Sequence, residues 1–386
     1  MSFLETLRRV DEGWRSPLLE QFGRYIAPGS PAGLESQAQM AAAVTRQHFG
    51  RTMRLFAPLY LSNECINNCS YCGFSRDNPI LRVTLSLDQV PREARHLAAE
   101  GFRSILLVAG EHPKFVSSGY LEQCLERLRP FIPSLAIEVG PSEAPEYRRM
   151  VDAGAEGLVV YQETYHQEEY ARLHTAGPKR DFAARLDCPE RGYAGGFRRI
   201  GLGCLLGLAD WRFDVLRLAA HLEHLLRHCW RANFTVSFPR LRPAAGSYEP
   251  SYHVTDEDYV RILTAFRLTF PQVGIVLSTR EAPALRNALL PLGITAMSAG
   301  SHTEPGGYTG AGTDDLHLTV KGRRVDLDEK PCSGATGQFD IADDRSPAEI
   351  SRLLQDRGFD PVWKDWDAAI LDSSRGADKG IAPSVL

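Results

Sequence analysis

The stretch Leu55-Phe-Ala-Pro-Leu-Tyr-Leu61, followed by Ser62-Asn-Glu-Cys65-Ile-Asn-Asn-Cys69-Ser-Tyr-Cys72, decides how the rest of the chain is interpreted. The first part is a short apolar run, which indicates a buried β-strand. The second part spaces three cysteines as C-x3-C-x2-C directly after that strand. We therefore expect a strand that places a loop with three thiolates at one end of a sheet.

Outward from this stretch, the region from Arg54 to Met297 alternates between short aliphatic runs and longer segments with apolar residues three and four positions apart. Such alternation is typical of a parallel sheet wrapped by helices. The eight strand candidates are Leu55 to Leu61, Ser104 to Val108, Leu135 to Val139, Gly157 to Tyr161, Arg199 to Gly203, Phe234 to Phe238, Val273 to Ser278 and Ile294 to Met297. Because eight parallel strands close a barrel, and the region is close to the roughly 250 residues of one, we predict an α/β fold of the TIM-type (β/α)8 class. An open doubly wound sheet is the alternative.

Two extensions flank the predicted barrel, which we place at residues 51–300. Residues 1–50 are expected to form an N-terminal extension of two or three helices, interrupted by Pro28 and Pro31. Residues 301–386 are expected to form a C-terminal loop and helix extension.

Within that C-terminal extension, Ser301 to Asp340 is rich in glycine, aspartate and threonine and has no sustained period. This composition predicts a long surface loop or a partly disordered segment. A final helix is expected after Ser346, with Pro347 in its first turn and Glu349 as the capping acid.

Composition narrows the class of protein. Of the 386 residues, 43% are hydrophobic and 24% are charged, which is the balance of a globular protein and excludes collagen-like or disordered chains. The net charge of −4 supplies no basic field for a polyanion, so we expect no nucleic-acid partner. No signal-peptide block or membrane-spanning stretch is found, and the eight cysteines then indicate a reducing compartment, so we expect a cytoplasmic protein with no membrane partner.

The three clustered cysteines admit two metal-binding interpretations. Thiolates are the ligands of iron–sulfur clusters, and three of them can bind three irons of a cubane while the fourth iron stays open to a small molecule. A zinc site is the alternative, but it would need a fourth ligand such as His96 or His112. Zinc sites usually pair two short ligand hairpins, and no second one is present, so we favour the cluster.

The cysteine loop after the first strand is the signature of the radical S-adenosylmethionine superfamily, and the chain resembles one branch of it over roughly residues 50 to 370. The matching blocks are Pro58-Leu-Tyr-Leu-Ser-Asn63, Cys72-Gly-Phe-Ser75, Leu107-Val-Ala-Gly-Glu-His112, Tyr161-Gln-Glu-Thr-Tyr-His166, Ser237-Phe-Pro-Arg-Leu-Arg-Pro243, Ser278-Thr-Arg-Glu281 and Val362-Trp-Lys-Asp-Trp366. These blocks are similar to those of the 2-iminoacetate synthases of thiazole biosynthesis, the ThiH tyrosine lyases. The chain departs from that family in Gly310 to Ala335, which is longer than usual and contains Cys332.

The resemblance implies a cofactor site with two components. Cys65, Cys69 and Cys72 would hold a 4Fe-4S cluster, whose open iron chelates S-adenosylmethionine. Glu111 would meet the ammonium group of that cofactor. Gln162, Glu163 and Arg240 complete the expected cofactor-binding set, although Gln162 and Glu163 could equally cap a helix and Arg240 could be a structural anchor.

The resemblance also implies a site for the substrate. Arg280 would bind the substrate carboxylate through its guanidinium fork, with Ser298 and Tyr60 beside it in the same mouth. Tyr60 could also be an ordinary core aromatic.

The reaction implied is hydrogen abstraction from L-tyrosine by a 5′-deoxyadenosyl radical, followed by Cα–Cβ scission to 2-iminoacetate and p-cresol. The implied partners are the thiazole synthase ThiG, which would take the unstable imine, and a flavodoxin-type or ferredoxin-type electron donor.

Two other functions are compatible with parts of the sequence. The nearest alternative is a related aromatic lyase. It would be either the hydrogenase-maturation tyrosine lyase or the tryptophan lyase of peptide-antibiotic pathways. The maturase carries a second cluster in a C-terminal domain with several cysteines, whereas only Cys332 lies beyond Cys229 here. The third possibility is a zinc-stabilised RNA-binding or RNA-modifying protein, which the negative net charge disfavours.

Overall fold

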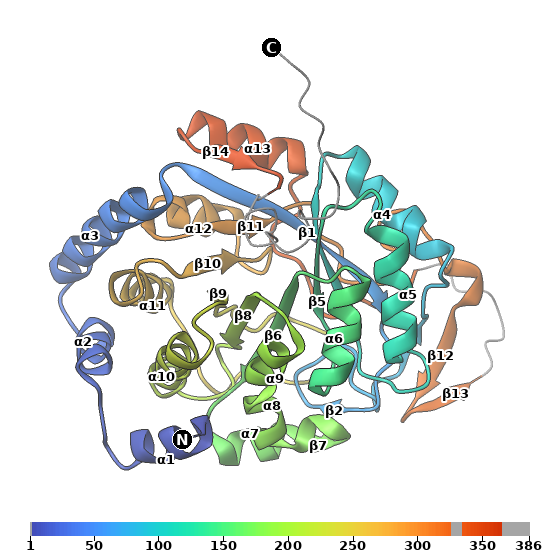
Figure 1. The fold of residues 1–386 in the computed structure, drawn as a ribbon, viewed down its shortest axis with the longest axis horizontal. Helices are drawn as coiled ribbons and strands as arrows, with labels where there is room; N and C mark the ends of the chain where they lie inside the picture. Colours follow the sequence, from blue (N-terminus) through green and yellow to red (C-terminus); the bar gives the residue numbers. More distant parts are fainter. Residues whose placement is uncertain (1, 326–333, 365–386) are drawn as a thin grey trace, which may run out of the picture.

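The computed structural model describes residues 2–325 and 334–364, and its central element is a closed parallel barrel (Figure 1). The eight barrel strands, in order around the barrel, are β1 (Thr52–Ser62), β4 (Ser104–Ala109), β5 (Ser134–Glu138), β6 (Gly157–Glu163), β8 (Arg199–Cys204), β9 (Asn233–Ser237), β10 (Gly274–Leu277) and β11 (Ala296–Ser298). The ring is closed by parallel pairing of β11 with β1, in which Ala296 lies opposite Arg54. The (β/α)8 prediction is therefore confirmed, and the open sheet is excluded.

Helices cover the outside of the barrel (Figure 1). They are α4 (Gln89–Ala99), α5 (Ser118–Leu128), α6 (Ala144–Ala153), α7 (Gln167–Leu173), α8 (Phe182–Leu186), α9 (Cys188–Gly195), α10 (Trp211–His228), α11 (Asp256–Thr269) and α12 (Pro283–Leu289), with 3-10 turns η1 (Pro178–Arg180), η2 (Leu290–Leu292) and η3 (Thr313–Asp315). The longest of these, α10, begins where the Asp210 side chain accepts a hydrogen bond from the backbone N–H of Phe213 at 3.0 Å. Such a cap satisfies one of the free N–H groups of the first turn.

The N-terminal extension forms three helices, α1 (Phe3–Asp11), α2 (Pro17–Ile26) and α3 (Pro31–Phe49). They lie against the outer sides of α10 and α11 (Figure 1), so α10 is buried on more than one face. Pro31 does not break a helix as expected. It begins α3, because proline lacks an N–H that the first turn would leave unbonded.

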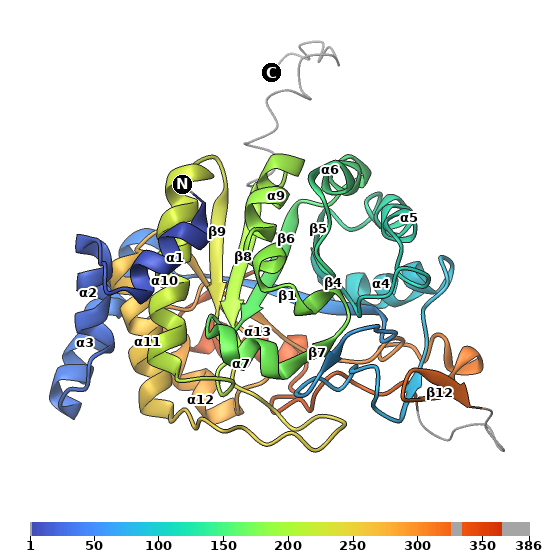
Figure 2. The ribbon, with the colours of Figure 1, turned by 90° about the horizontal axis from the view of Figure 1, so that it is seen from below.

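The expectation of a long surface loop from Ser301 to Asp340 is wrong for the part that forms strands, and residues 326–333 of that segment lie outside the described residues. β12 (His317–Val320) pairs antiparallel with both β13 (Arg323–Val325) and β3 (Ile80–Arg82). A second small sheet joins β2 (Asn68–Cys69) to β7 (His174–Ala176). In Figure 2 the strands β8 and β9 point toward the end of the barrel where β7 and β12 lie. The C-terminal segment therefore adds a small sheet at the carboxyl end of the barrel, by pairing β12 with β3.

The last described helix matches the prediction, whereas the strand after it was not predicted. α13 (Pro347–Asp356) begins at Ser346, whose side chain exchanges the two bonds of a capping box with Glu349. β14 (Asp360–Val362) then pairs with the first residues of β1. Cys332 and Trp366 lie outside the described residues. Over the described ranges, we find no helix long and apolar enough to cross a membrane.

A buried ion pair connects the C-terminal extension to the barrel, and it leads to a stability prediction. Asp343 is fully buried and binds Arg286, which exposes 1% of its surface. Asp343→Ala would leave the Arg286 guanidinium buried without a counter-charge, so we expect the free energy of unfolding to fall by about 3–5 kcal/mol. A urea titration measures this loss.

The matched control for that experiment is Asp88→Ala, which removes the partner of Arg127 at an exposed position. Exposed ion pairs contribute only about 0–1 kcal/mol, so this variant should unfold nearly as the parent does. Equal losses for the two variants would contradict a stabilising role for the buried pair.

Candidate active site at the carboxyl end of the barrel

The cysteine loop is held in place by Arg82, which is almost completely buried. Its guanidinium donates to the carbonyl of Asn63, which precedes the cysteines, and to the carbonyl of Ser75, which follows them, the latter at 2.7 Å. A third bond, to the Thr319 hydroxyl at 2.5 Å, connects the same side chain to β12. Arg82 therefore fixes both ends of the loop, and the C-terminal extension supports it.

The three cysteines lie within electrostatic reach of one another. Cys69 is buried, whereas Cys65 and Cys72 are half-buried. Burial raises the pKa of the Cys65 thiol, and the nearby Cys72 adds to the rise. Burial also raises the pKa of Cys69, with Lys179 opposing this effect and the two other cysteines adding to it. Three mutually repelling thiolates at one place fit a group that supplies several cationic irons, as a 4Fe-4S cluster does.

The zinc alternative finds no support in the arrangement of the histidines. His96 pairs with Glu100 on α4, and the His112 ring packs against Phe115. Among residues 2–325 and 334–364, no three His, Cys, Asp or Glu side chains surround a single metal position. A cubane does not require such a point, because each of its thiolates binds a different iron.

Glu111 is positioned beside the cysteine loop. The Asn67 amide, between the first two cysteines, donates to its carboxylate at 2.7 Å, and the Ile66 N–H donates to its carbonyl at 2.8 Å. A Cβ at Gly140 would lie 2.5 Å from the Glu111 side chain, so only glycine at that position leaves room for it. The carboxylate predicted to meet the cofactor is thus fixed against the loop predicted to hold the cluster.

Gln162 and Glu163 end β6 in different environments. Glu163 forms ion pairs with Lys179 at 2.6 Å and Arg185 at 3.4 Å. Burial alone would raise the pKa of Glu163, but these two cations outweigh it and hold the pKa below its usual value. The backbone of Glu163 has a φ of 71°, which is strained for a residue with a side chain. The Gln162 carbonyl oxygen is buried and has no hydrogen-bond partner, so it is available to a bound donor.

Tyr60 and Arg280 lie in the same mouth, close to the cysteines. Tyr60 packs edge-on against Phe74, and Cys65 and Cys72 border the same hydrophobic cluster. Burial raises the pKa of the Tyr60 hydroxyl, and Arg280 is near enough to oppose the rise. The Arg280 guanidinium lies 3.4 Å over the ring of Phe339.

Ser298 ends β11, opposite Phe56 of β1. Its carbonyl accepts a hydrogen bond from Arg286, so the buried ion pair of the previous section also supports this strand end.

The Arg240 guanidinium is bonded to protein groups and not directed to a free position in the mouth. Its guanidinium binds the carboxylates of Glu281 and Asp256 and donates to the Val254 carbonyl at 3.1 Å. These bonds use the donors that a cofactor would need, which is the geometry of a structural anchor. A direct contact between Arg240 and a cofactor stays a prediction.

The segment Thr336 to Phe339, which the sequence places in a loop, enters the mouth. The Gln338 side chain accepts a hydrogen bond from the Tyr60 hydroxyl at 2.8 Å and approaches the Cys72 sulfur at 3.9 Å. Sequence reasoning missed Gln338 and Phe339, because their contacts are with residues much earlier in the chain. It also missed Arg82, whose bonds join the two ends of the cysteine loop to β12. It also missed Glu138, although a lone acid at the end of an apolar strand is a detectable signal.

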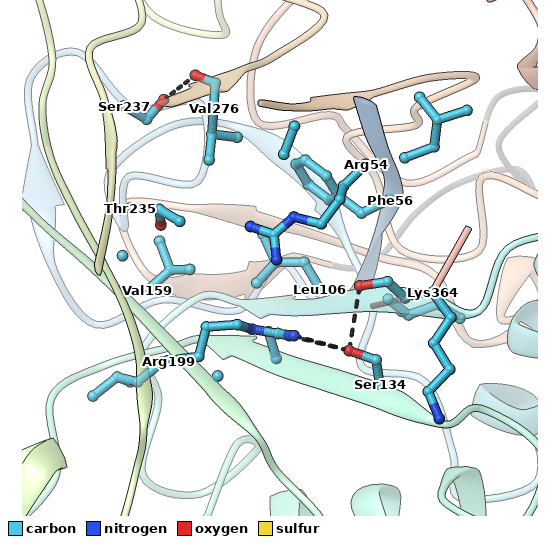
Figure 3. Close-up of a pocket in the computed structure, with 18 of the residues that line it drawn as sticks. Arg54, Phe56, Leu106, Ser134, Val159, Arg199, Thr235, Ser237, Val276 and Lys364 are labelled. Carbon is cyan, nitrogen blue, oxygen red and sulfur yellow. Dashed lines mark hydrogen bonds between the residues drawn. The ribbon is translucent and has the colours of Figure 1, made fainter. Parts of the chain in front are cut away.

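Below the mouth, the barrel encloses a cavity of about 850 Å³, including the part open to solvent. Figure 3 shows the apolar side chains of Phe56, Leu106 and Val159 on its walls, together with the cations Arg54 and Arg199. The barrel interior is therefore a lined space with room for a bound molecule.

Comparison with known proteins agrees with this arrangement. The family model described as the radical SAM superfamily matches residues 59–217, and the biotin and thiamin synthesis associated domain matches residues 237–360. The chain is 42% identical to the 2-iminoacetate synthase of Escherichia coli (strain K12) over 91% of its length and 88% of that protein. It is 40% identical to the 2-iminoacetate synthase of Salmonella typhimurium, over 89% of this chain and 86% of that one.

Solved structures of other proteins resemble this chain in fold. The FeFe-hydrogenase maturase HydG from Carboxydothermus hydrogenoformans superposes with a TM-score of 0.80 at 34% identity, covering 94% of this chain and 80% of that one. Methylornithine synthase, PylB, shares the fold with a TM-score of 0.68 at 21% identity, over 94% of this chain and 99% of that one. The extent of identity with the two synthases decides the assignment, and the chain belongs to the 2-iminoacetate synthase family of the radical SAM superfamily.

Proposed function

We propose that the protein is a radical S-adenosylmethionine lyase that cleaves the Cα–Cβ bond of L-tyrosine, giving 2-iminoacetate and p-cresol for the thiazole of thiamine. The observation that carries this proposal is the meeting of the three cysteines, Tyr60 and Arg280 in one mouth of a closed barrel. Identity of 42% to a 2-iminoacetate synthase supports the choice of reaction.

Cys65, Cys69 and Cys72 hold the 4Fe-4S cluster in this proposal, and Glu111 beside them binds the ammonium group of S-adenosylmethionine. When bound, cluster and cofactor supply the 5′-deoxyadenosyl radical that attacks the substrate. The unpartnered Gln162 carbonyl oxygen is suited to accept a ribose hydroxyl. Glu163 already binds two cations, so it acts at most as a shared acceptor for that ribose.

Arg280, Ser298 and Tyr60 position the amino acid. The guanidinium binds its carboxylate bidentately, and the two hydroxyls add neutral donors. Phe339 covers one face of the guanidinium, and Gln338 orients the Tyr60 hydroxyl. This covering segment also excludes water from the mouth, which radical chemistry requires.

The nearest alternatives differ in substrate or in a second cluster. The HydG structures resemble this chain in fold, but the only cysteine after Cys229 is Cys332, and one thiolate is insufficient to hold another cluster. A tryptophan lyase would bind its substrate carboxylate through the same Arg280, so only the reaction product distinguishes the two activities.

The unstable imine gives a reason for direct transfer to a second enzyme, which we propose to be the thiazole synthase ThiG. Reduction of the cluster needs a one-electron donor of the flavodoxin or ferredoxin type. With these two partners, the proposed location of the enzyme is the cytoplasm.

The test is anaerobic incubation of the reconstituted protein with S-adenosylmethionine, dithionite and either tyrosine or tryptophan. We expect p-cresol and 5′-deoxyadenosine with tyrosine, detected by mass spectrometry, and a broad absorbance near 400 nm before reaction. Indole-derived fragments from tryptophan, or a colourless protein containing one equivalent of zinc, would refute the proposal.

A further inference from the structure

One acid of the barrel interior has no role in the function as argued so far. Glu138 is the last residue of β5. Ser134 and Ala136 of the same strand line the interior cavity, where Figure 3 shows Ser134. Because side chains alternate along a strand, Glu138 belongs to the same interior face. It therefore stands above the cavity and at the base of the mouth.

Strand pairing fixes the neighbours of Glu138. It lies opposite Val108 of β4, and Val108 lies opposite Tyr60 of β1. These three residues form one row of the interior surface. Electrostatic effects agree, because Glu138 raises the pKa of both the Tyr60 and the Tyr161 hydroxyls.

Strand order places Glu138 across the barrel from Arg280, the residue proposed to bind the substrate carboxylate. Around the ring, β5 stands four places from β10, whose end leads into Arg280. In a ring of eight strands, that separation is the full diameter. An amino acid held by Arg280 at its carboxylate therefore extends across the interior toward β5.

Glu138 also lacks a partner. Within the described ranges, no hydrogen bond or ion pair is made by its carboxylate. Burial raises the pKa of Glu138 to about 7, Glu163 adds to this rise, and Arg280, Arg185 and Lys179 oppose it. The Glu138 side chain is only half-buried, so its carboxylate is open to a ligand that supplies the missing donor.

We propose that Glu138 accepts a hydrogen bond from the phenol hydroxyl of bound L-tyrosine and so selects tyrosine over other aromatic amino acids. This inference rests on the proposed function. The apolar side chains of Phe56, Leu106 and Val159 in the cavity below suit an aromatic ring. Glu138 offers an acidic acceptor on β5, across the ring of strands from Arg280. A charge-assisted bond of this kind is stronger than a neutral one.

Selection follows from the same geometry. Phenylalanine would occupy the cavity but leave the carboxylate unpaired, and sites built to bond a substrate hydroxyl reject such analogues strongly. Tryptophan presents a larger ring and an N–H at another position.

The test compares two ligands with two variants. Dissociation constants for tyrosine and phenylalanine are measured on the reconstituted holoenzyme with S-adenosylmethionine bound. Glu138→Leu should weaken tyrosine binding roughly 100-fold or more, and it should not weaken phenylalanine binding, because phenylalanine then leaves no carboxylate unpaired. Glu138→Gln keeps an acceptor oxygen and should recover part of the loss. Glu122→Gln, on the outer face of α5, is the matched control and should change neither constant.

A pH profile gives a second readout that a structural role would not produce. Ionised Glu138 is the better acceptor, so kcat/KM for tyrosine should rise with pH around 7, and this rise should disappear in Glu138→Gln.

Three outcomes would overturn the inference. Equal weakening of tyrosine and phenylalanine would mean that Glu138 contacts the amino group. Weakened binding of S-adenosylmethionine alone would place it on the cofactor, and unchanged constants would remove it from the site. If the parent enzyme forms p-cresol, each of these results rejects only the role of Glu138. Absence of p-cresol from the parent would instead reject the proposed function.

Discussion

Alanine in place of any one of Cys65, Cys69 and Cys72 is expected to reduce cleavage of S-adenosylmethionine to the background of the assay. Each thiolate would bind a different iron, so none of the remaining ligands can replace a lost one. The loop offers no substitute, because Arg82 fixes both of its ends. The variants should lose the absorbance near 400 nm and form no 5′-deoxyadenosine, and both are measured after anaerobic reconstitution.

Cys124→Ala is the matched control, since this thiol is buried on α5, away from the mouth. It should retain the cluster and the activity, with at most a modest loss of stability from the small cavity. A Cys69→Ala enzyme with four irons and undiminished cofactor cleavage would contradict the assignment of the ligands.

Removing the guanidinium of Arg280 is expected to have the next largest effect. The carboxylate of tyrosine would lose a bidentate, partly desolvated partner, a change that typically costs about 2–5 kcal/mol. At about 1.4 kcal/mol per factor of ten, Arg280→Ala should raise the dissociation constant for tyrosine roughly 30- to 4,000-fold. Arg280→Lys keeps the charge but not the fork, so it should recover only part of this loss.

The measurement for Arg280 is tyrosine binding to the holoenzyme, followed by uncoupled cleavage of S-adenosylmethionine without substrate. The cluster spectrum should stay unchanged, which separates loss of the clamp from loss of the cofactor site. Arg127→Lys, at an exposed pair with Asp88, is the control for a charge-preserving arginine change. Unaltered tyrosine binding in Arg280→Ala would place the carboxylate elsewhere.

Most barrel elements could be predicted because their signals are local. The run Leu55 to Leu61 lies within β1, and the capping residues Asp210 and Ser346 begin α10 and α13 as expected. Each of these signals depends on residues a few positions apart, where the backbone and its neighbouring side chains decide the conformation. The expectation that Pro31 breaks a helix was wrong, because proline is also favoured in the first turn of a helix, which is its position in α3.

The C-terminal segment could not be predicted for the opposite reason. In β12, His317 pairs with Arg82 of β3, and the Gln338 side chain is hydrogen-bonded to Tyr60. In both cases the partner lies more than two hundred residues earlier in the chain. The hydrophobic periodicity of a segment does not indicate pairing with a distant strand. The high glycine content of this segment instead favoured the prediction of a loop. The acid Glu138 at the end of an apolar run is visible in the sequence, but its position across the barrel from Arg280 depends on closure of the ring.

The amino-acid sequence by itself determined the strand and helix segments, the three-cysteine loop and the resemblance to a family. These depend on the order and spacing of residues, which the chain carries in any conformation. The tertiary structure alone decided that Arg280 and Glu138 face each other across the barrel, that Gln338 reaches Tyr60, and that Arg240 binds Glu281. Closure of the eight strands brings these distant residues together, and burial in the interior then sets which charges are paired.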